Sequence, residues 1–236
     1  ALIVLVVSFV LLGLFAARQL GLEHPVLNVR PMASSRFWPA CVLVVVSMMT
    51  TFSMSVLLPL YFEGAYGMTA LAAGLYILPA IAVNAVTSVV GGRLMDGYGP
   101  WPLLPIGFAL IALGQVGVAL TATSLQLWVV VALTVVVYAG VGLVMSPSQT
   151  AGLGTLPPAE QTHGTALLNT WNMIAASFGP SLFIGLLSSA AVAAGASGAT
   201  AELAQAVGFS AAVRVAAVIA VVGFAVSLVY AFKRRA

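Results

Sequence analysis

Long, nearly uninterrupted runs of apolar residues are the feature that most constrains this sequence. A helix needs about 20 apolar residues to cross the hydrocarbon core of a bilayer, and the chain contains a series of such runs. Only 6% of the 236 residues are charged and 62% are hydrophobic, whereas a soluble domain carries about 25% charged residues. The runs are continuous rather than alternating, which argues against the strands of a membrane β-barrel. The sequence therefore predicts an all-α, polytopic membrane protein of about seven transmembrane helices.

Short polar or glycine-rich links separate the predicted spans. The chain begins inside an apolar run without a Met, so we expect it to start within a longer protein. Residues 1–36 are predicted to hold a truncated helix and a polar link, and residues 37–236 a bundle of six helices. The predicted spans are 1–17, 37–62, 70–90, 102–121, 127–150, 164–188 and 211–232.

The basic residues are sorted to one side of these spans, as the positive-inside rule requires of a cytoplasmic face. That side holds Arg18, Arg30, Arg36, Arg93, Lys233, Arg234 and Arg235. The opposite side holds Glu63 and Glu202, with Arg214 just inside the last span. We therefore expect a plasma or inner membrane protein with its first residue outside and its C-terminus in the cytoplasm. The same sorting explains the net charge of +3 without a nucleic-acid partner.

The stretch 91–101 is a polar turn between two apolar runs. Arg93 and Asp96 lie three residues apart, so a helical continuation would place them on one face. Gly97 and Gly99 permit the tight backbone that a reversal needs. Taken alone, the stretch is also compatible with a solvated turn that has no further role.

Several motifs of this chain resemble those of the major facilitator superfamily of transporters. Gly-Gly-Arg-Leu-Met-Asp-Gly-Tyr-Gly-Pro-Trp-Pro at 91–102 resembles the family's Gly-Arg-Leu-x-Asp-Arg-x-Gly-x-Arg turn. Leu-Pro-Leu-Tyr-Phe at 58–62 and Ala-Gly-Leu-Tyr-Ile-Leu-Pro at 73–79 are similar to a motif pair of its fourteen-helix drug:proton antiporter branch. His-Gly-Thr-Ala-Leu-Leu-Asn-Thr at 163–170 resembles that branch's later loop and helix. The resemblance covers nearly the whole chain and corresponds to the C-terminal half of such a transporter.

The resemblance implies efflux of amphipathic small molecules by proton antiport and alternating access, with no cofactor. It implies that the missing N-terminal half is a partner. No carboxylate falls in the middle of a predicted span, so either that half holds the titratable group of a proton-coupled transporter or this fragment does not show the group. The resemblance also implies a conformational latch formed by Gly92, Arg93, Asp96, Gly97 and Gly99. Gly97 and Trp101 stand where the family usually carries a basic residue, so the implied latch is weakened.

A few polar side chains fall inside the predicted spans. Such groups are costly in lipid and face the bundle interior or a cavity. Asn169 and Asn172 lie three residues apart and share one helical face. The candidates for a substrate cavity are Asn84, Gln149, Asn169, Asn172 and Met173. The alternative is interhelical hydrogen bonding, which averages about 0.6 kcal/mol.

Other classes of function fit the sequence poorly. Gly-Ala-Ser-Gly at 195–198 matches the Gly-x-Ser-Gly motif of intramembrane serine proteases, but His24 and His163 are predicted on the opposite side of the membrane from Ser197. One Cys and two separated His do not make a metal site, and we expect no enzyme activity. The remaining alternatives are a non-transporting membrane scaffold, the remnant of a truncated gene, or a major facilitator for another small solute.

Overall fold

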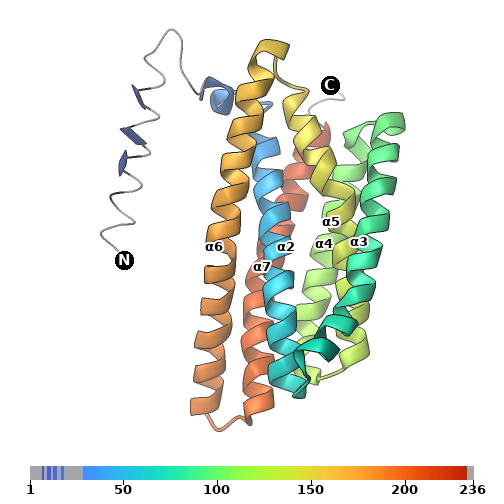
Figure 1. Cartoon of the computed structure of the whole chain (residues 1–236), viewed down its shortest axis with the longest axis vertical. Coiled ribbons are helices and arrows are strands. Elements are labelled where there is room, and N and C mark those ends of the chain that lie inside the picture. Colours follow the sequence, from blue (N-terminus) through green and yellow to red (C-terminus); the bar gives the residue numbers. More distant parts are fainter. Residues whose placement is uncertain (1–6, 8–9, 12, 15–16, 19–28, 233–236) are drawn as a thin grey trace.

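The computed structural model describes residues 29–232 together with Val7, Val10, Leu11, Gly13, Leu14, Ala17 and Arg18. Six long helices run along one axis (Figure 1), and all six are long and apolar enough to cross a membrane. They are α2 (Trp38–Tyr66), α3 (Ala70–Tyr98), α4 (Pro100–Thr121), α5 (Leu127–Leu153), α6 (Gln161–Ala196) and α7 (Ala201–Phe232). The part of the chain described contains no strand, which confirms the all-α prediction.

Six of the seven predicted spans correspond to these helices. The first predicted span, 1–17, lies largely outside the described residues, as does most of the predicted 1–36 segment. The link into the bundle is described from Val29, and it contains a short 3₁₀ turn, η1 (Arg30–Ala33), before α2.

The structure corrects several predicted helix ends. The predicted turn at 91–101 is mostly helical, because α3 continues to Tyr98 and α4 begins at Pro100. Only Gly99 separates the two helices, and its φ of 74° is a left-handed conformation that glycine adopts without strain. Pro100 then occupies the first position of α4, where the missing N–H costs nothing.

The predicted loop at 189–210 is also mostly helical. α6 extends to Ala196 and α7 begins at Ala201. This segment is rich in alanine, the best helix former, so its small side chains do not mark a loop. α6 has 36 residues and is therefore about 54 Å long, well beyond the roughly 30 Å of hydrocarbon that a span must cross.

Helix α2 contacts α5, α6 and α7 along the bundle, while α4 packs between α5 and α7. Tyr61 of α2 anchors this core: its ring stacks on Phe209 at 4.1 Å between centroids, and its hydroxyl donates to the Ala122 carbonyl at 2.7 Å. Helix α3 packs chiefly on α5, and α6 packs on α7 and α2. α3 and α6 therefore form opposite edges of the bundle (Figure 1).

The two ends of the bundle differ in charge. The end at the top of Figure 1 carries the start of α2, the α3–α4 junction and the α5–α6 link. Arg30, Arg36 and Arg93 belong to this end, while Glu63 and Glu202 belong to the opposite end. This arrangement agrees with the charge sorting on which the predicted orientation rests.

Candidate functional site

Helix α6 leaves a broad surface exposed along the bundle. It is fixed to its neighbours by one buried stripe, which comprises Gly164, Leu167, Leu168, Ala175, Gly179, Phe183 and Leu187. Gly164 fits closely at this seam, because a Cβ there would overlap the Leu156 side chain and lie 3.1 Å from Leu153 Cδ2. Asn169 and Asn172 lie about 8 and 12 Å farther along the helix, within the candidate membrane span Pro158–Ala196.

The two asparagines on α6 have unused hydrogen-bonding capacity. Asn169 is exposed, and within the described residues its side chain has no hydrogen-bond partner. Asn172 is half-buried, and its Oδ1 is buried without a partner in this part of the chain. Met173 is 68% exposed beside them. The predicted cluster of Asn169, Asn172 and Met173 therefore lies on one helical face, as the spacing indicates.

Several hydroxyl groups on α6 are satisfied within the helix itself. Thr165, Thr170 and Ser177 each donate to the carbonyl four residues earlier, all at 2.9 Å. The amides cannot be satisfied in this way here, so they remain available to water, a ligand or another protein segment. In a membrane span such groups mark a cavity or a contact that can hydrogen-bond, because lipid chains offer no partner.

Asn84 behaves differently from the α6 amides. Its Nδ2 donates to the Tyr138 carbonyl on α5 at 3.0 Å, so it already joins two helices of the bundle. The sequence left both roles open for this residue, and the structure favours the packing role. Gln149 is half-buried near the end of α5. The structure therefore brings together the α6 candidates but leaves Asn84 on α3, at the other edge of the bundle (Figure 1).

The candidate latch lies in the last two turns of α3. Arg93 and Asp96 are both exposed, and the described residues contain no ion pair between them. A Cβ added at Gly92 or at Gly97 would meet no neighbour, so neither glycine is required by packing. Among the three latch glycines, Gly99 is the one whose positive φ favours glycine. The sequence predicted that Arg93 and Asp96 share one helical face. The segment around them, which was predicted to be a turn, is the end of helix α3.

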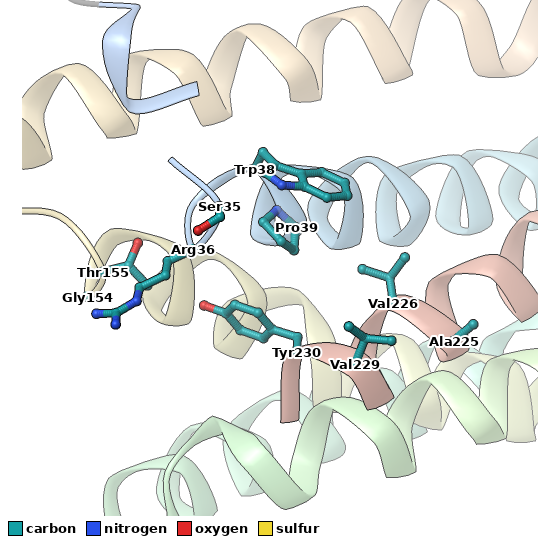
Figure 2. A pocket seen from close by; sticks show the side chains of 10 residues that line it. All are labelled: Ser35, Arg36, Trp38, Pro39, Gly154, Thr155, Ala225, Val226, Val229 and Tyr230. Carbon is teal, nitrogen blue, oxygen red and sulfur yellow. The ribbon is translucent and has the colours of Figure 1, made fainter. Parts of the chain in front are cut away.

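A cavity of about 840 Å³ lies where the start of α2 meets the ends of α5 and α7. Figure 2 shows Trp38 and Pro39 on one side of it and Val226, Val229 and Tyr230 on the other. The Tyr230 hydroxyl donates to the Ala151 carbonyl at 3.1 Å. Sequence reasoning missed this cavity because its walls come from three distant segments. The local signal in the sequence was Arg36 close to Trp38, because a charged group beside a large apolar ring is typical of a wall with both polar and apolar parts.

The bundle core also contains polar groups that sequence reasoning did not single out. Gln115 of α4 is fully buried, and its Nε2 donates to Ser53 Oγ at 3.5 Å. Gln115 Oε1 and Thr50 Oγ1 are buried without a partner among the described residues. The signal was a lone Gln within an apolar run, which is costly in lipid.

A six-helix membrane bundle that presents unpaired amides inside the span has the features of a membrane transport protein, in which such groups mark a solute pathway. The sequence model of the Major Facilitator Superfamily matches residues 1–180. The chain therefore belongs to the Major Facilitator Superfamily, as its motifs indicated.

Curated relatives agree with this assignment. The chain is 34% identical to the lincomycin resistance protein LmrB of Listeria monocytogenes over 192 residues, which are 79% of this chain and 40% of that protein. It is 34% identical to the MFS-type transporter YcnB of Bacillus subtilis, over 96% of this chain and 48% of that protein. It is 22% identical to the riboflavin transporter RibZ of Clostridioides difficile, over 75% of this chain and 39% of that protein. The chain thus spans less than half the length of these relatives.

Proposed function

We propose that this chain forms the C-terminal half of an efflux transporter that exports amphipathic small molecules by proton antiport. In this proposal the exposed face of α6 lines one wall of a central cavity, and a second bundle supplies the other wall. The two bundles rock about the cavity and expose it to each side of the membrane in turn.

The observation that carries the proposal is the pair of unpaired amides on α6. Asn169 and Asn172 place hydrogen-bonding groups inside the apolar span, next to the flexible and apolar Met173. Ligand sites typically combine apolar walls with a few polar groups that orient the ligand. The relative named as a lincomycin resistance protein supports an amphipathic drug as the solute class.

Orientation and coupling form the finer part of the proposal. We place the arginine-bearing end in the cytoplasm, where Arg93 and Asp96 act on the conformational change rather than on the solute. The carboxylates Glu63, Asp96, Glu160 and Glu202 all lie near helix ends or in links. A proton-coupled transporter uses a titratable group within the membrane, and we place that group outside this chain.

Drug accumulation in an efflux-deficient bacterium tests the proposal directly. Expression of the full-length protein is expected to lower the accumulation of lincomycin, and a protonophore is expected to abolish the difference. Replacing both amides with Leu should weaken export while the protein still reaches the membrane. Unchanged accumulation with well-expressed protein would contradict export of this solute class.

Residues 29–232 alone provide a second test. A single bundle carries one wall of the proposed cavity, so in liposomes it should support no solute-driven proton movement. Coupled movement through this segment alone would overturn the two-bundle proposal.

Transport of a more polar solute is the second candidate. It is supported by the relative named as a riboflavin transporter and by the amides themselves, which could orient a ring system rich in hydrogen-bonding groups. Parallel uptake and export measurements with riboflavin and lincomycin distinguish the two candidates, since each predicts a preference for its own solute.

A further inference from the structure

Arg214 is a basic residue that the transport proposal does not use. It lies on α7, is exposed, and has no hydrogen bond or ion pair with any described residue. The other seven basic residues belong to the arginine-bearing end or to the terminal segments. An arginine within a membrane span is costly unless it finds an anionic or hydrogen-bonding partner, so the surroundings of Arg214 indicate what that partner is.

The depth of Arg214 follows from its neighbours. Ser210 Oγ donates to the Ala119 carbonyl of α4 at 2.7 Å, which sets the register of α4 against α7. Arg214 lies one helical turn beyond Ser210, and Ala119 is two residues from the end of α4 at Thr121. The backbone of Arg214 is therefore about 9 Å inside that end. A long arginine side chain can extend this far toward the headgroups while its stem lies on apolar surface.

An apolar groove adjoins Arg214. A cavity of about 380 Å³ is lined by Val116, Ala119, Leu120, Arg214, Ala217, Val218, Val221 and Val222. Its α7 wall extends from Arg214 to Val222, a length of about 12 Å. Leu120 and Val218 are 69% and 65% exposed, so the groove is open at the bundle surface. Arg214 is the single charged group of its wall.

We propose that this groove is a binding site for an anionic phospholipid. The phosphate accepts hydrogen bonds from the Arg214 guanidinium, and one acyl chain lies along the valines of α7. We choose a phospholipid as the ligand because of charge complementarity: guanidinium and phosphate form strong, often bidentate, charge-assisted hydrogen bonds. A purely apolar transmembrane helix in the groove would leave the arginine unpaired, whereas a phospholipid supplies both the anion and the chain.

The net charge of the headgroup should also matter. Phosphatidylglycerol presents its phosphate without a compensating cation, whereas phosphatidylethanolamine carries an ammonium group that competes for the phosphate. The groove is therefore expected to prefer phosphatidylglycerol. This site is separate from the α6 amides, so its occupancy can be measured without any transport assay.

Native mass spectrometry of the full-length protein in detergent, titrated with phosphatidylglycerol, tests the site. Arg214→Gln is expected to weaken binding of the tightest lipid about tenfold, as the loss of a charged hydrogen bond predicts. Val218→Trp, which fills the groove but keeps the charge, should weaken binding of the same lipid.

Arg93→Gln is the matched control, because it removes the same charge from an exposed position outside this groove and should leave the tightest site unchanged. Binding of that lipid at the wild-type level by both Arg214→Gln and Val218→Trp, with wild-type thermal unfolding, would overturn the proposal. Equal weakening by glycerol phosphate and by the intact lipid as competitors would show a bare anion site, which also overturns it. Efficient cross-linking of two copies through Val218→Cys would instead assign the groove to a second chain.

Discussion

Helices α3 and α6 are the two least buried spans of the bundle, yet their polar groups behave in opposite ways. On α3, the amide of Asn84 is bonded to α5, and the exposed large side chains are mainly aliphatic, such as Leu75, Ile81 and Val86. On α6, Asn169 and Asn172 lie among exposed residues with unused bonding capacity. Exposure therefore does not by itself identify a transport surface, and the proposed transport role of α6 rests on its unpaired amides.

Close backbone contacts attach both helices to the bundle. A Cβ on Gly208 of α7 would overlap the Leu187 carbonyl oxygen of α6. The backbone of α3 approaches α5 so closely that a Cβ on Gly142 would lie 2.7 Å from the Asn84 carbonyl oxygen and 2.9 Å from the Ser88 nitrogen. On α6, a Cβ on Gly185 would meet nothing within 4 Å. We infer that α3 is held rigidly against α5 and α6 against α7, while the exposed face of α6 has room for solute.

The largest effect is expected at the contact between α3 and α5. Gly142→Ala should destabilise the protein by about 1–3 kcal/mol, the usual cost of overpacking, because backbone atoms cannot move away as a side chain can. Gly142→Val should prevent accumulation of folded protein. Thermal unfolding followed by size-exclusion chromatography measures both effects.

Gly185→Ala is the matched control on α6, with an expected change in stability within about 0.5 kcal/mol. If Gly142→Ala and Gly185→Ala have equal stabilities, the close approach of α3 to α5 does not hold the bundle together. The contrast between a packed helix contact and the exposed face of α6 would then lose its structural basis.

The amides should separate stability from transport. Asn169→Leu with Asn172→Leu is expected to reduce transport about tenfold, as loss of a ligand hydrogen bond predicts, with little change in thermal unfolding. Asn84→Leu should instead lower the melting temperature slightly and leave transport unchanged. This substitution removes one interhelical hydrogen bond of about 0.6 kcal/mol. Transport per folded molecule and melting temperature are measured for each variant. A loss of transport from Asn84→Leu equal to that from the α6 pair would remove the distinction.

The smallest effect is expected at the end of α3. Asp96 is exposed and has no ion pair with Arg93 in the part of the chain described. Asp96→Asn should slow turnover by about two- to fivefold, since exposed charge interactions are worth about 0–1 kcal/mol. Substrate affinity should stay close to that of the wild type. A large loss of affinity with normal turnover would place Asp96 at the solute instead.

The sequence predicted the membrane class, the six spans of the bundle and the family, because apolar run length and local motifs carry that information. It misplaced the ends at 91–101 and 189–210, because glycine and alanine remain helical when neighbouring helices or local propensity support them. Spacing alone placed Asn169 beside Asn172. The bond from Asn84 to Tyr138 and the groove at Arg214 could not be predicted, because each depends on how two helices pack.

Cysteine accessibility tests the central claim most directly. Cys41, the one cysteine of the chain, is buried and can be replaced with Ala in the full-length protein. Asn169→Cys on α6 and Val86→Cys on α3 are then exposed in membranes to a small water-soluble methanethiosulfonate reagent. The account predicts fast labelling at position 169, slowed by bound solute, and little labelling at position 86. Slow labelling at position 169, or equal labelling at both positions, would contradict a water-filled cavity along α6.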